Sequence, residues 1–291
     1  MPVSFGQLCS VFKLRIGVAI AFTALAGLAV TPGGSAVPLW KVAVLVLAVL
    51  MASASAGAFN QYIERDYDHL MARTRNRPFV TGALRPGWHW PALMATLLTT
   101  AVTLAGLALG SIAALHVFLG AFFYGVVYTV WLKRRGWINI VIGGLAGSFA
   151  VLAGAASADG VGVALAPASW LFAAVLFLWT PPHFWSLAMA KCDDYAAAGI
   201  PMLPVVVGDR RAAQVILAHT LALVGVSLLP AAFGLGPIYL ACAAVGGALF
   251  CWRSVRLALA PGKATAMANF YASLIQLCLL LVGAYSEFWL Q

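Results

Sequence analysis

Residues 38–68, PLWKVAVLVLAVLMASASAGAFNQYIERDYD, decide the fold class of this chain. As far as residue 59 the stretch is apolar or small apart from Lys41, and its charged cluster begins only after Asn60. A run of this length fits the roughly 20 residues that cross a bilayer as one helix. We therefore predict a membrane-spanning helix that ends in a polar segment.

The rest of the chain has the same character. Of its 291 residues, 63% are hydrophobic and 9% are charged, whereas soluble domains are about half apolar and a quarter charged. Because so few charges cannot cover a water-exposed surface, we expect most of the surface of this protein to face the lipid bilayer. The composition excludes a soluble globular protein. It predicts an all-α polytopic membrane protein in which residues 1–291 form a single transmembrane domain.

Apolar runs between charges and Gly or Pro breaks give about nine transmembrane helices. The weakest boundary is at Gly110, but about 40 apolar residues must reverse direction within a bilayer. The predicted spans lie near 14–31, 38–59, 91–109, 111–131, 138–158, 163–190, 212–233, 236–252 and 268–288.

The basic residues indicate the orientation of this bundle. If the spans alternate, 16 of the 17 Lys and Arg lie on one side and Lys41 on the other. That asymmetry predicts a cytoplasmic N-terminus and a C-terminus outside, in the periplasm. It also explains the net charge of +9 without nucleic acid. The start of the chain lacks the features of a signal or transit peptide, which favours a bacterial inner (plasma) membrane. We assign this topological role to most of Lys13, Arg15, Arg134, Arg135, Arg253 and Arg256.

Carboxylates are concentrated on the same basic side, although topology does not require it. Acidic and basic side chains occur together in two loops at the membrane surface, which favours a site for a metal ion and a phosphate group. Six of the eight Asp and Glu residues fall in two loops, as Glu64, Asp66 and Asp68 and as Asp193, Asp194 and Asp209.

In the first loop, three side chains recur every four residues, namely Asn60, Glu64 and Asp68. On a helix this spacing places them on one face, where like charges repel unless a cation lies between them. Mg²⁺ suits this set because it needs few protein ligands and completes its shell with water and phosphate. Arg73 and Arg77 fit phosphate edges, and Asp66 is expected to pair with a neighbouring arginine. The alternative is a solvated, ion-paired loop.

The second loop follows an apolar run interrupted by Pro181 and Pro182, which predict a broken helix that lines a cavity. His183, at this break, is either a functional residue or a hydrogen-bonded packing residue. We predict that Asp193 and Asp194 form a second metal site, with Lys191 near a phosphate. The supporting candidates are Tyr128, Lys133 and Arg134, whereas close helix packing is expected at Gly143, Gly144 and Gly147.

Three blocks resemble the UbiA family of intramembrane prenyltransferases. They are NQYIERDYDHLMARTRNRP (60–78), YTVWLKRRGWINIVIGGLAG (128–147) and WTPPHFWSLAMAKCDDYAAAGIPMLPVV (179–206). Together with KLR (13–15) and NFYASL (269–274), the resemblance covers roughly residues 13–275. The third block is similar to the branch that prenylates heme. One departure is GSFAVLAG at 147–154, where that branch carries a proline pair.

The resemblance implies roles for particular residues. Asn60, Glu64 and Asp68 would form the first magnesium-diphosphate motif, with Arg73 and Arg77 near the phosphates. The residues of the opposing half would be Lys133, Lys191, Asp193 and Asp194. Because the two aspartates are adjacent in this chain, Asp194 is the stronger candidate. His183 is the candidate that would orient the heme iron.

The resemblance also implies a reaction. The farnesyl group of farnesyl diphosphate would pass to a vinyl group of heme b, with addition of water, to give heme O for terminal oxidases. Mg²⁺ would be the cofactor, and heme a substrate. Whether the protein works beside a heme A synthase or an oxidase assembly factor stays open. The alternatives are a related transferase with a quinone-precursor acceptor and, in another class, a membrane transporter.

Overall fold

The computed structural model describes residues 4–158 and 166–290, and within these ranges every regular element is helical. Eight helical stretches are long and apolar enough to cross a membrane. They are α3 (Leu39–Glu64), α4 (His89–Leu109), Ser111–Leu132, Asn139–Ala156, α9 (Pro167–Ala190), Asp209–Phe233, α13 (Pro237–Leu259) and α14 (Lys263–Leu290). A bent pair, α1 (Phe5–Val11) and α2 (Leu14–Ala29), meets at 52° and would make a ninth span. The predicted bundle of about nine spans is confirmed in this form.

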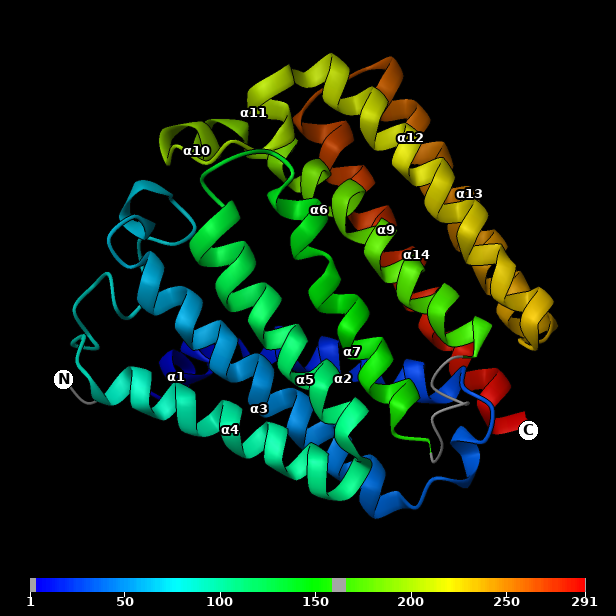
Figure 1. The fold of residues 1–291 in the computed structure, drawn as a ribbon. Helices are drawn as coiled ribbons and strands as arrows, with labels where there is room; N and C mark the ends of the chain where they lie inside the picture. Colours follow the sequence, from blue (N-terminus) through cyan, green and yellow to red (C-terminus); the bar gives the residue numbers. More distant parts are fainter. Residues whose placement is uncertain (1–3, 159–165, 291) are drawn as a thin grey trace.

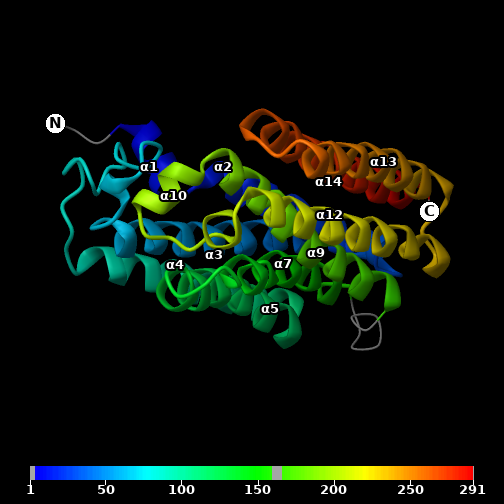
Figure 2. The same cartoon turned by 90° about the horizontal axis from the view of Figure 1, so that it is seen from above.

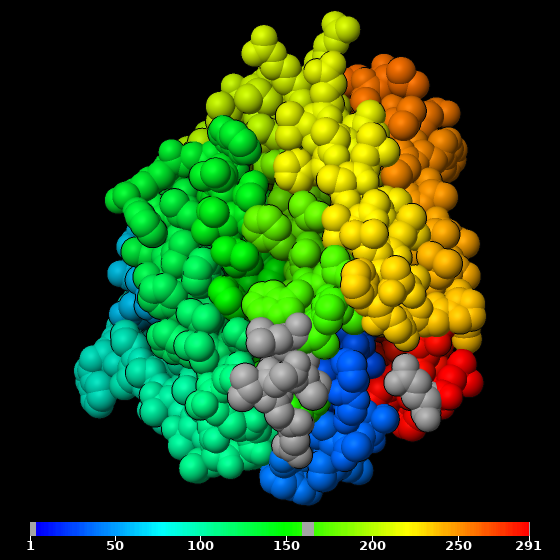
Figure 3. All heavy atoms as spheres, turned by 45° about the vertical axis from the view of Figure 1, so that its right-hand side comes forward, coloured from blue at the N-terminus to red at the C-terminus, as the bar shows by residue number. Residues whose placement is uncertain are grey.

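The polar connections gather at one end of the bundle, and the C-terminus lies at the other (Figure 1). That polar end holds the segment 65–88, α10 (Cys192–Ala197) and α11 (Leu203–Val207). Seen from above, the pair α13 and α14 covers one side of the molecule, and α4 and α5 (Ser111–Phe122) lie on the opposite side (Figure 2). The space-filling view shows α9 between these two flanks (Figure 3). The loops that carry the candidate residues therefore meet over one mouth of the bundle.

The prediction that Pro181 and Pro182 break the sixth span is wrong. Both prolines lie inside the continuous helix α9. Prolines are tolerated in membrane helices because side chains and neighbouring helices satisfy the carbonyls that lose their donors. Next to the pair, Thr180 Oγ1 donates to Leu176 O at 2.9 Å and Ser186 Oγ donates to Pro182 O at 2.6 Å. Hydroxyl groups therefore surround the proline pair without interrupting the helix.

The expected single helical face through Asn60, Glu64 and Asp68 is also wrong in part. Helix α3 ends at Glu64, and Asp68 begins a separate 3₁₀ turn, η2 (Asp68–Leu70). All three side chains are nevertheless buried, each with 3% of its surface exposed. The chain turn at 65–67 brings Asp68 back to the site, so folding beyond the helix assembles this cluster.

One helix boundary agrees with the sequence, and a second, inside the fifth span, was not predicted. Gly110 ends α4 with φ of 101°, a conformation that favours glycine, and α5 begins directly after it. In the fifth span, α6 (Asn139–Gly143) and α7 (Leu145–Ala156) meet at Gly144. Residues 147–154, which lack the proline pair, lie within the uninterrupted α7. Asp159 and the start of the predicted span 163–190 fall outside the described residues.

Two glycines allow α2 and α7 to cross closely. A Cβ atom on Gly27 would lie 2.0 Å from Val151 O, and one on Gly154 would lie 1.8 Å from Ala24 O. Among the glycines predicted for packing, Gly143 and Gly144 are tight, with neighbours 3.0 Å from such an atom, whereas none lies within 4 Å for Gly147. The α2–α7 contact closes one wall of the cavity described below.

Candidate functional site

A cavity of about 600 Å³ opens at the polar end of the bundle. Its walls include residues of α2, α3, α5, α7 and the segment η3 (Phe123–Leu132), and its deeper lining is apolar or small except for His116. A volume of this size is typical of small-molecule sites. Its mouth is polar and basic, with lining residues Lys13, Asn60, Gln61, Arg73, Asn76, Arg77, Lys133 and Tyr195.

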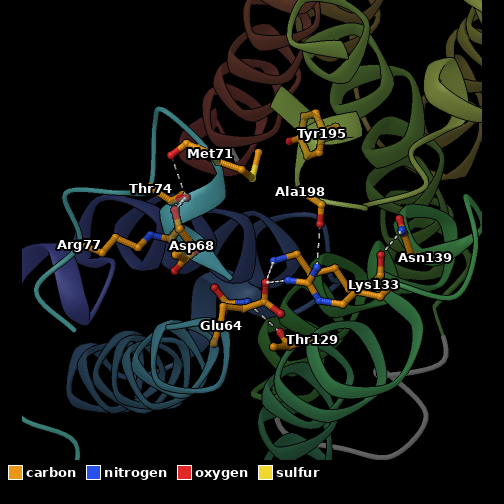
Figure 4. A network of polar contacts seen from close by, with 12 residues as sticks. Glu64, Asp68, Met71, Thr74, Arg77, Thr129, Lys133, Asn139, Tyr195 and Ala198 are labelled. Carbon is orange, nitrogen blue, oxygen red and sulfur yellow. Dashed lines mark hydrogen bonds and ion pairs between the residues drawn. The ribbon is translucent and has the colours of Figure 1, made fainter. Parts of the chain in front are cut away.

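The two buried carboxylates at this mouth are each held by cations (Figure 4). Arg77 Nη1 donates to Asp68 Oδ2 at 2.6 Å. Glu64 Oε2 accepts from Lys133 Nζ and, at 2.9 Å, from Arg134 Nη2. Burial lowers the pKa of the Lys133 ammonium and is the largest influence on it. The neighbouring Glu64 carboxylate acts in the opposite direction and raises this pKa. Acids and bases from distant parts of the chain thus form one paired network.

Lys13 belongs to this network, and its assignment to a purely topological role is corrected. Its backbone adopts φ of 48°, a left-handed conformation that is uncommon outside glycine and that marks strain at functional sites. Its Nζ donates to Asn60 Oδ1 at 2.6 Å and to Tyr124 Oη at 2.7 Å. Composition and charge gave no sign of this role, and only the short KLR match near the start pointed to this residue.

The segment η3 is a π-helix, a rare conformation that is often found at functional sites. Its wider turn makes the Lys133 N–H donate to Tyr128 O at 2.9 Å, five residues back. Thr129 Oγ1 donates to Tyr124 O at 2.8 Å and accepts from Asn60 Nδ2 at 3.0 Å. The rings of Tyr124 and Tyr128 stack with centroids 5.7 Å apart. This conformation brings two tyrosines and a lysine to the same cavity wall.

The second polar loop packs against the first. Arg134 lies over the Tyr67 ring, 3.8 Å from its centroid, and donates to Ala198 O at 3.0 Å. Arg73 lies 5.6 Å from the ring centroid of Tyr195, a buried residue of α10 that lines the cavity. Neither Tyr67 nor Tyr195 was singled out from the sequence. Aromatic faces therefore hold two arginines at the mouth.

The predicted second carboxylate pair lies farther out. Asp193 is exposed and its Oδ2 accepts from Lys263 Nζ at 3.0 Å, with 86% and 72% of their side-chain surfaces exposed. Asp194 is half-buried next to Tyr195, and Lys191 is exposed at the end of α9. In the first loop, Asp66 lies 3.5 Å from Arg65, which is the expected ion pair with a neighbouring arginine.

His183 is buried between two rings and does not itself line the cavity. Its ring stacks on Trp179 at 4.1 Å and on Phe270 at 4.5 Å, and its Nδ1 lies 2.7 Å from Ser273 Oγ. Its chain neighbour Phe184 does line the cavity. The hydrogen-bonded packing role that the sequence left open therefore describes its contacts.

The residues at the mouth suit Mg²⁺ together with a phosphate group. Within the described ranges, no three His, Cys, Asp or Glu side chains come together as a complete metal site. Asn60, Glu64 and Asp68 nevertheless offer two buried carboxylates and an amide. Mg²⁺ accepts one or two carboxylates and takes its other ligands from water and phosphate oxygens. The surrounding Lys and Arg side chains are of the types that bind phosphate groups.

Comparisons with known proteins agree with this geometry. The model of the UbiA prenyltransferase family matches residues 20–289. Protoheme IX farnesyltransferase 2 of Paramagnetospirillum magneticum is 59% identical over 99% of this chain and 98% of its own. The protoheme IX farnesyltransferase of Xylella fastidiosa strain 9a5c is 39% identical over 96% of this chain and 94% of its own.

Solved structures share the fold. A structure of digeranylgeranylglyceryl phosphate synthase matches with a TM-score of 0.80 at 16% identity, over 97% of this chain and 98% of that one. A UbiA homologue from Archaeoglobus fulgidus, bound to DMAPP and Mg²⁺, matches with a TM-score of 0.71 at 15% identity, over 98% and 100%. These likenesses confirm the predicted bundle of a multi-pass membrane protein. The chain belongs to the UbiA prenyltransferase family, in its protoheme IX farnesyltransferase branch.

Proposed function

We propose that this chain transfers the farnesyl group of farnesyl diphosphate to a vinyl group of heme b, with addition of water, to give heme O. The observation that supports this most directly is a buried mouth of paired acids and bases above an apolar cavity. The polar mouth fits a diphosphate, and the apolar part fits a prenyl chain. The identity of the acceptor, heme b, is inferred from the relatives, which are protoheme IX farnesyltransferases.

Ionisation of the allylic C–O bond is the first chemical step. The C1–O bond of farnesyl diphosphate breaks, and its electron pair leaves with the diphosphate. Lys13, Arg77 and Lys133 line the mouth where this negative charge develops, and fixed cations there stabilise it. Asn60, Glu64 and Asp68 would hold Mg²⁺, which would supply further positive charge to the diphosphate when bound.

The cavity then protects the farnesyl cation. The stacked rings of Tyr124 and Tyr128 line its wall next to the mouth, and aromatic faces attract a cation. The apolar lining limits stray water. The terminal vinyl carbon of heme b forms the new bond to C1. Water adds to the vinyl carbon next to the porphyrin ring and loses a proton, so no protein nucleophile is needed.

Two further roles extend this proposal. His183 is the candidate residue that would orient the heme iron, as the resemblance implies. Since Nδ1 lies against Ser273, Nε2 would be the ligand nitrogen. Asp193, Asp194 and Lys191 form the candidate opposing half of the diphosphate site, with Asp194 the least exposed of the three.

The N-terminus and the polar mouth would lie on the cytoplasmic side of the cell inner membrane, as the distribution of Lys and Arg favours.

The test is an assay in membranes that contain the wild type or Asp68→Asn. Heme b, farnesyl diphosphate and Mg²⁺ are supplied, and the hemes are resolved by chromatography and mass. Heme O is expected from the wild type. We expect Asp68→Asn to lose at least about tenfold in rate, because a buried charged pair loses a charge.

The matched control is Asp66→Asn, since Asp66 lies two residues away with 70% of its side chain exposed. It should retain nearly full activity because exposed ion pairs contribute little. If the wild type released pyrophosphate with an aromatic acceptor but made no heme O, the prenyltransferase chemistry would stand and the heme acceptor would be rejected.

A further inference from the structure

The apolar part of the cavity has walls that repeat once per helical turn. On α3, the lining residues below Asn60 include Ala56, Ala52 and Val49, at intervals of four, four and three residues, together with Gly57 and Ser53. Facing them, α7 contributes Ala146, Ala150 and Ala153. Residues at such spacings share one face of a helix. The lining therefore extends three turns of α3 below the polar mouth, and we call this part of the cavity the shaft.

The depth of this shaft follows from helix geometry. From Asn60 to Val49, α3 rises about 16 Å at 1.5 Å per residue. An extended chain advances about 1.2 Å per bond, so the roughly eleven main-chain bonds of a farnesyl group span about 13 Å. The remaining few ångströms suit the link from C1 to the phosphate. Each isoprene unit, at about 5 Å, matches one helical turn of 5.4 Å.

The shaft ends in a packed core. Val49 and Ala153 are 5% and 0% exposed and are the lining residues of α3 and α7 that lie farthest from the mouth. One turn farther along α3, Leu45 is 0% exposed and does not line the cavity. Leu45 belongs to a buried cluster that includes Leu28 and Leu109. A fourth isoprene unit would need the volume that Leu45 occupies.

We propose that the shaft measures prenyl chain length, with Leu45 and Val49 as its floor and Ala52 keeping its second turn open. The inference rests on the proposed function, because it assumes that a prenyl diphosphate binds with its phosphates at the mouth. Three isoprene units fill the shaft, two leave its lowest turn empty, and four meet the floor. The chain thus selects the farnesyl group over the geranyl and geranylgeranyl groups.

The first measurement is the affinity of the purified protein for non-hydrolysable thiolodiphosphates of the geranyl, farnesyl and geranylgeranyl groups. Calorimetry on these analogues needs no acceptor, so it separates this inference from the heme assignment. The wild type is expected to bind the farnesyl analogue about tenfold more tightly than either of the others, because one hydrocarbon step in a pocket changes recognition by that order.

Two kinds of variant should move this preference in opposite directions. Leu45→Ala deepens the floor and should improve relative binding of the geranylgeranyl analogue by about tenfold. Val49→Ala should act in the same direction, and it serves if Leu45→Ala does not fold. Ala52→Leu fills the second turn and should favour the geranyl analogue by a similar factor.

Matched controls lie on the same helix but outside the shaft. Leu47 is 49% exposed and Ala43 is also exposed, so Leu47→Ala and Ala43→Leu should leave the order of affinities unchanged. If the shaft variants bind the three analogues in the wild-type order, the shaft does not measure length. If the wild type binds none of them, the proposed function falls first. A separate activity assay can supply each variant with the prenyl diphosphate that it binds most tightly. A heme product that carries a prenyl chain of the same length, resolved by mass, would show that the bound chain is the transferred chain.

Discussion

Lys13 shows how a single residue joins separate parts of the site. Its ammonium donates to Asn60 on α3 and to Tyr124 on η3, while its backbone stands between α1 and α2. A Cβ atom on Gly57 would lie 3.2 Å from Lys13 Cβ, so a small residue there leaves room for the lysine. One side chain thus links the N-terminal bend to the metal-ligand candidate Asn60.

Replacing Lys13 by methionine keeps the length of the side chain and removes its charge. We expect Lys13→Met to weaken binding of the farnesyl thiolodiphosphate by about 10- to 100-fold, because hydrogen bonds to charged groups contribute about 1.5–3 kcal/mol. Calorimetry on purified protein measures this loss. Arg15→Met is the control, since Arg15 is exposed two residues away. Equal losses in both variants would mean that the effect is general electrostatic attraction.

At the scale of elements, the π-helix η3 decides which side chains reach the cavity. The sequence FYGVVYTVWL is typical of an ordinary apolar span, and no residue in it predicts the wider π-helical turn. The turn is stabilised by contacts from outside the segment, since Asn60 Nδ2 donates to Thr129 Oγ1. The prolines of α9 are the reverse case, because local rules predicted a break, whereas the helix continues through both prolines.

Thr129 is the position at which this element can be tested. Thr129→Val preserves shape but removes the hydroxyl that contacts Asn60 and Tyr124. A buried polar group left without a partner costs about 1–3 kcal/mol, so kcat/KM for heme O formation should fall by about tenfold. Thr129→Ser keeps the hydroxyl and should retain most of the activity. A Thr129→Ser variant as impaired as Thr129→Val would point to the methyl group and to packing instead.

At the scale of the whole molecule, close helix crossings set the shape of the cavity. Gly154 on α7 lies against Ala24 on α2, and Ala153 next to it lines the shaft. At the far side of the bundle, Glu287 of α14 accepts from the N–H groups of Ile238 and Tyr239, at 2.7 and 3.2 Å. This acid, which lies away from the polar mouth, therefore caps the start of α13.

Gly154→Ala should destabilise the bundle. The added methyl group would lie 1.8 Å from Ala24 O, and the backbone must move to admit it. Overpacking of this kind costs about 1–3 kcal/mol or more, which should lower the midpoint of thermal unfolding in detergent. Gly147→Ala, on the same helix with no neighbour within 4 Å, should leave the midpoint unchanged or raise it. A similar fall in both variants would show that helix flexibility, and not the crossing, explains the loss.

The sequence alone determined the fold class, the approximate spans and the loops that carry the site, because these follow from hydropathy, charge and short motifs along the chain. Glu64, Asp68, Arg77 and Lys133 could be singled out in this way, and the structure gathers them at one mouth. Only the tertiary structure decided which side chains contact one another in the site. Lys13 joins Asn60, Asp68 returns through a turn, and His183 faces Ser273 on a helix ninety residues away in sequence. The physical reason is that partner choice, the π-helix and the depth of the shaft depend on contacts between distant segments, which local patterns do not encode.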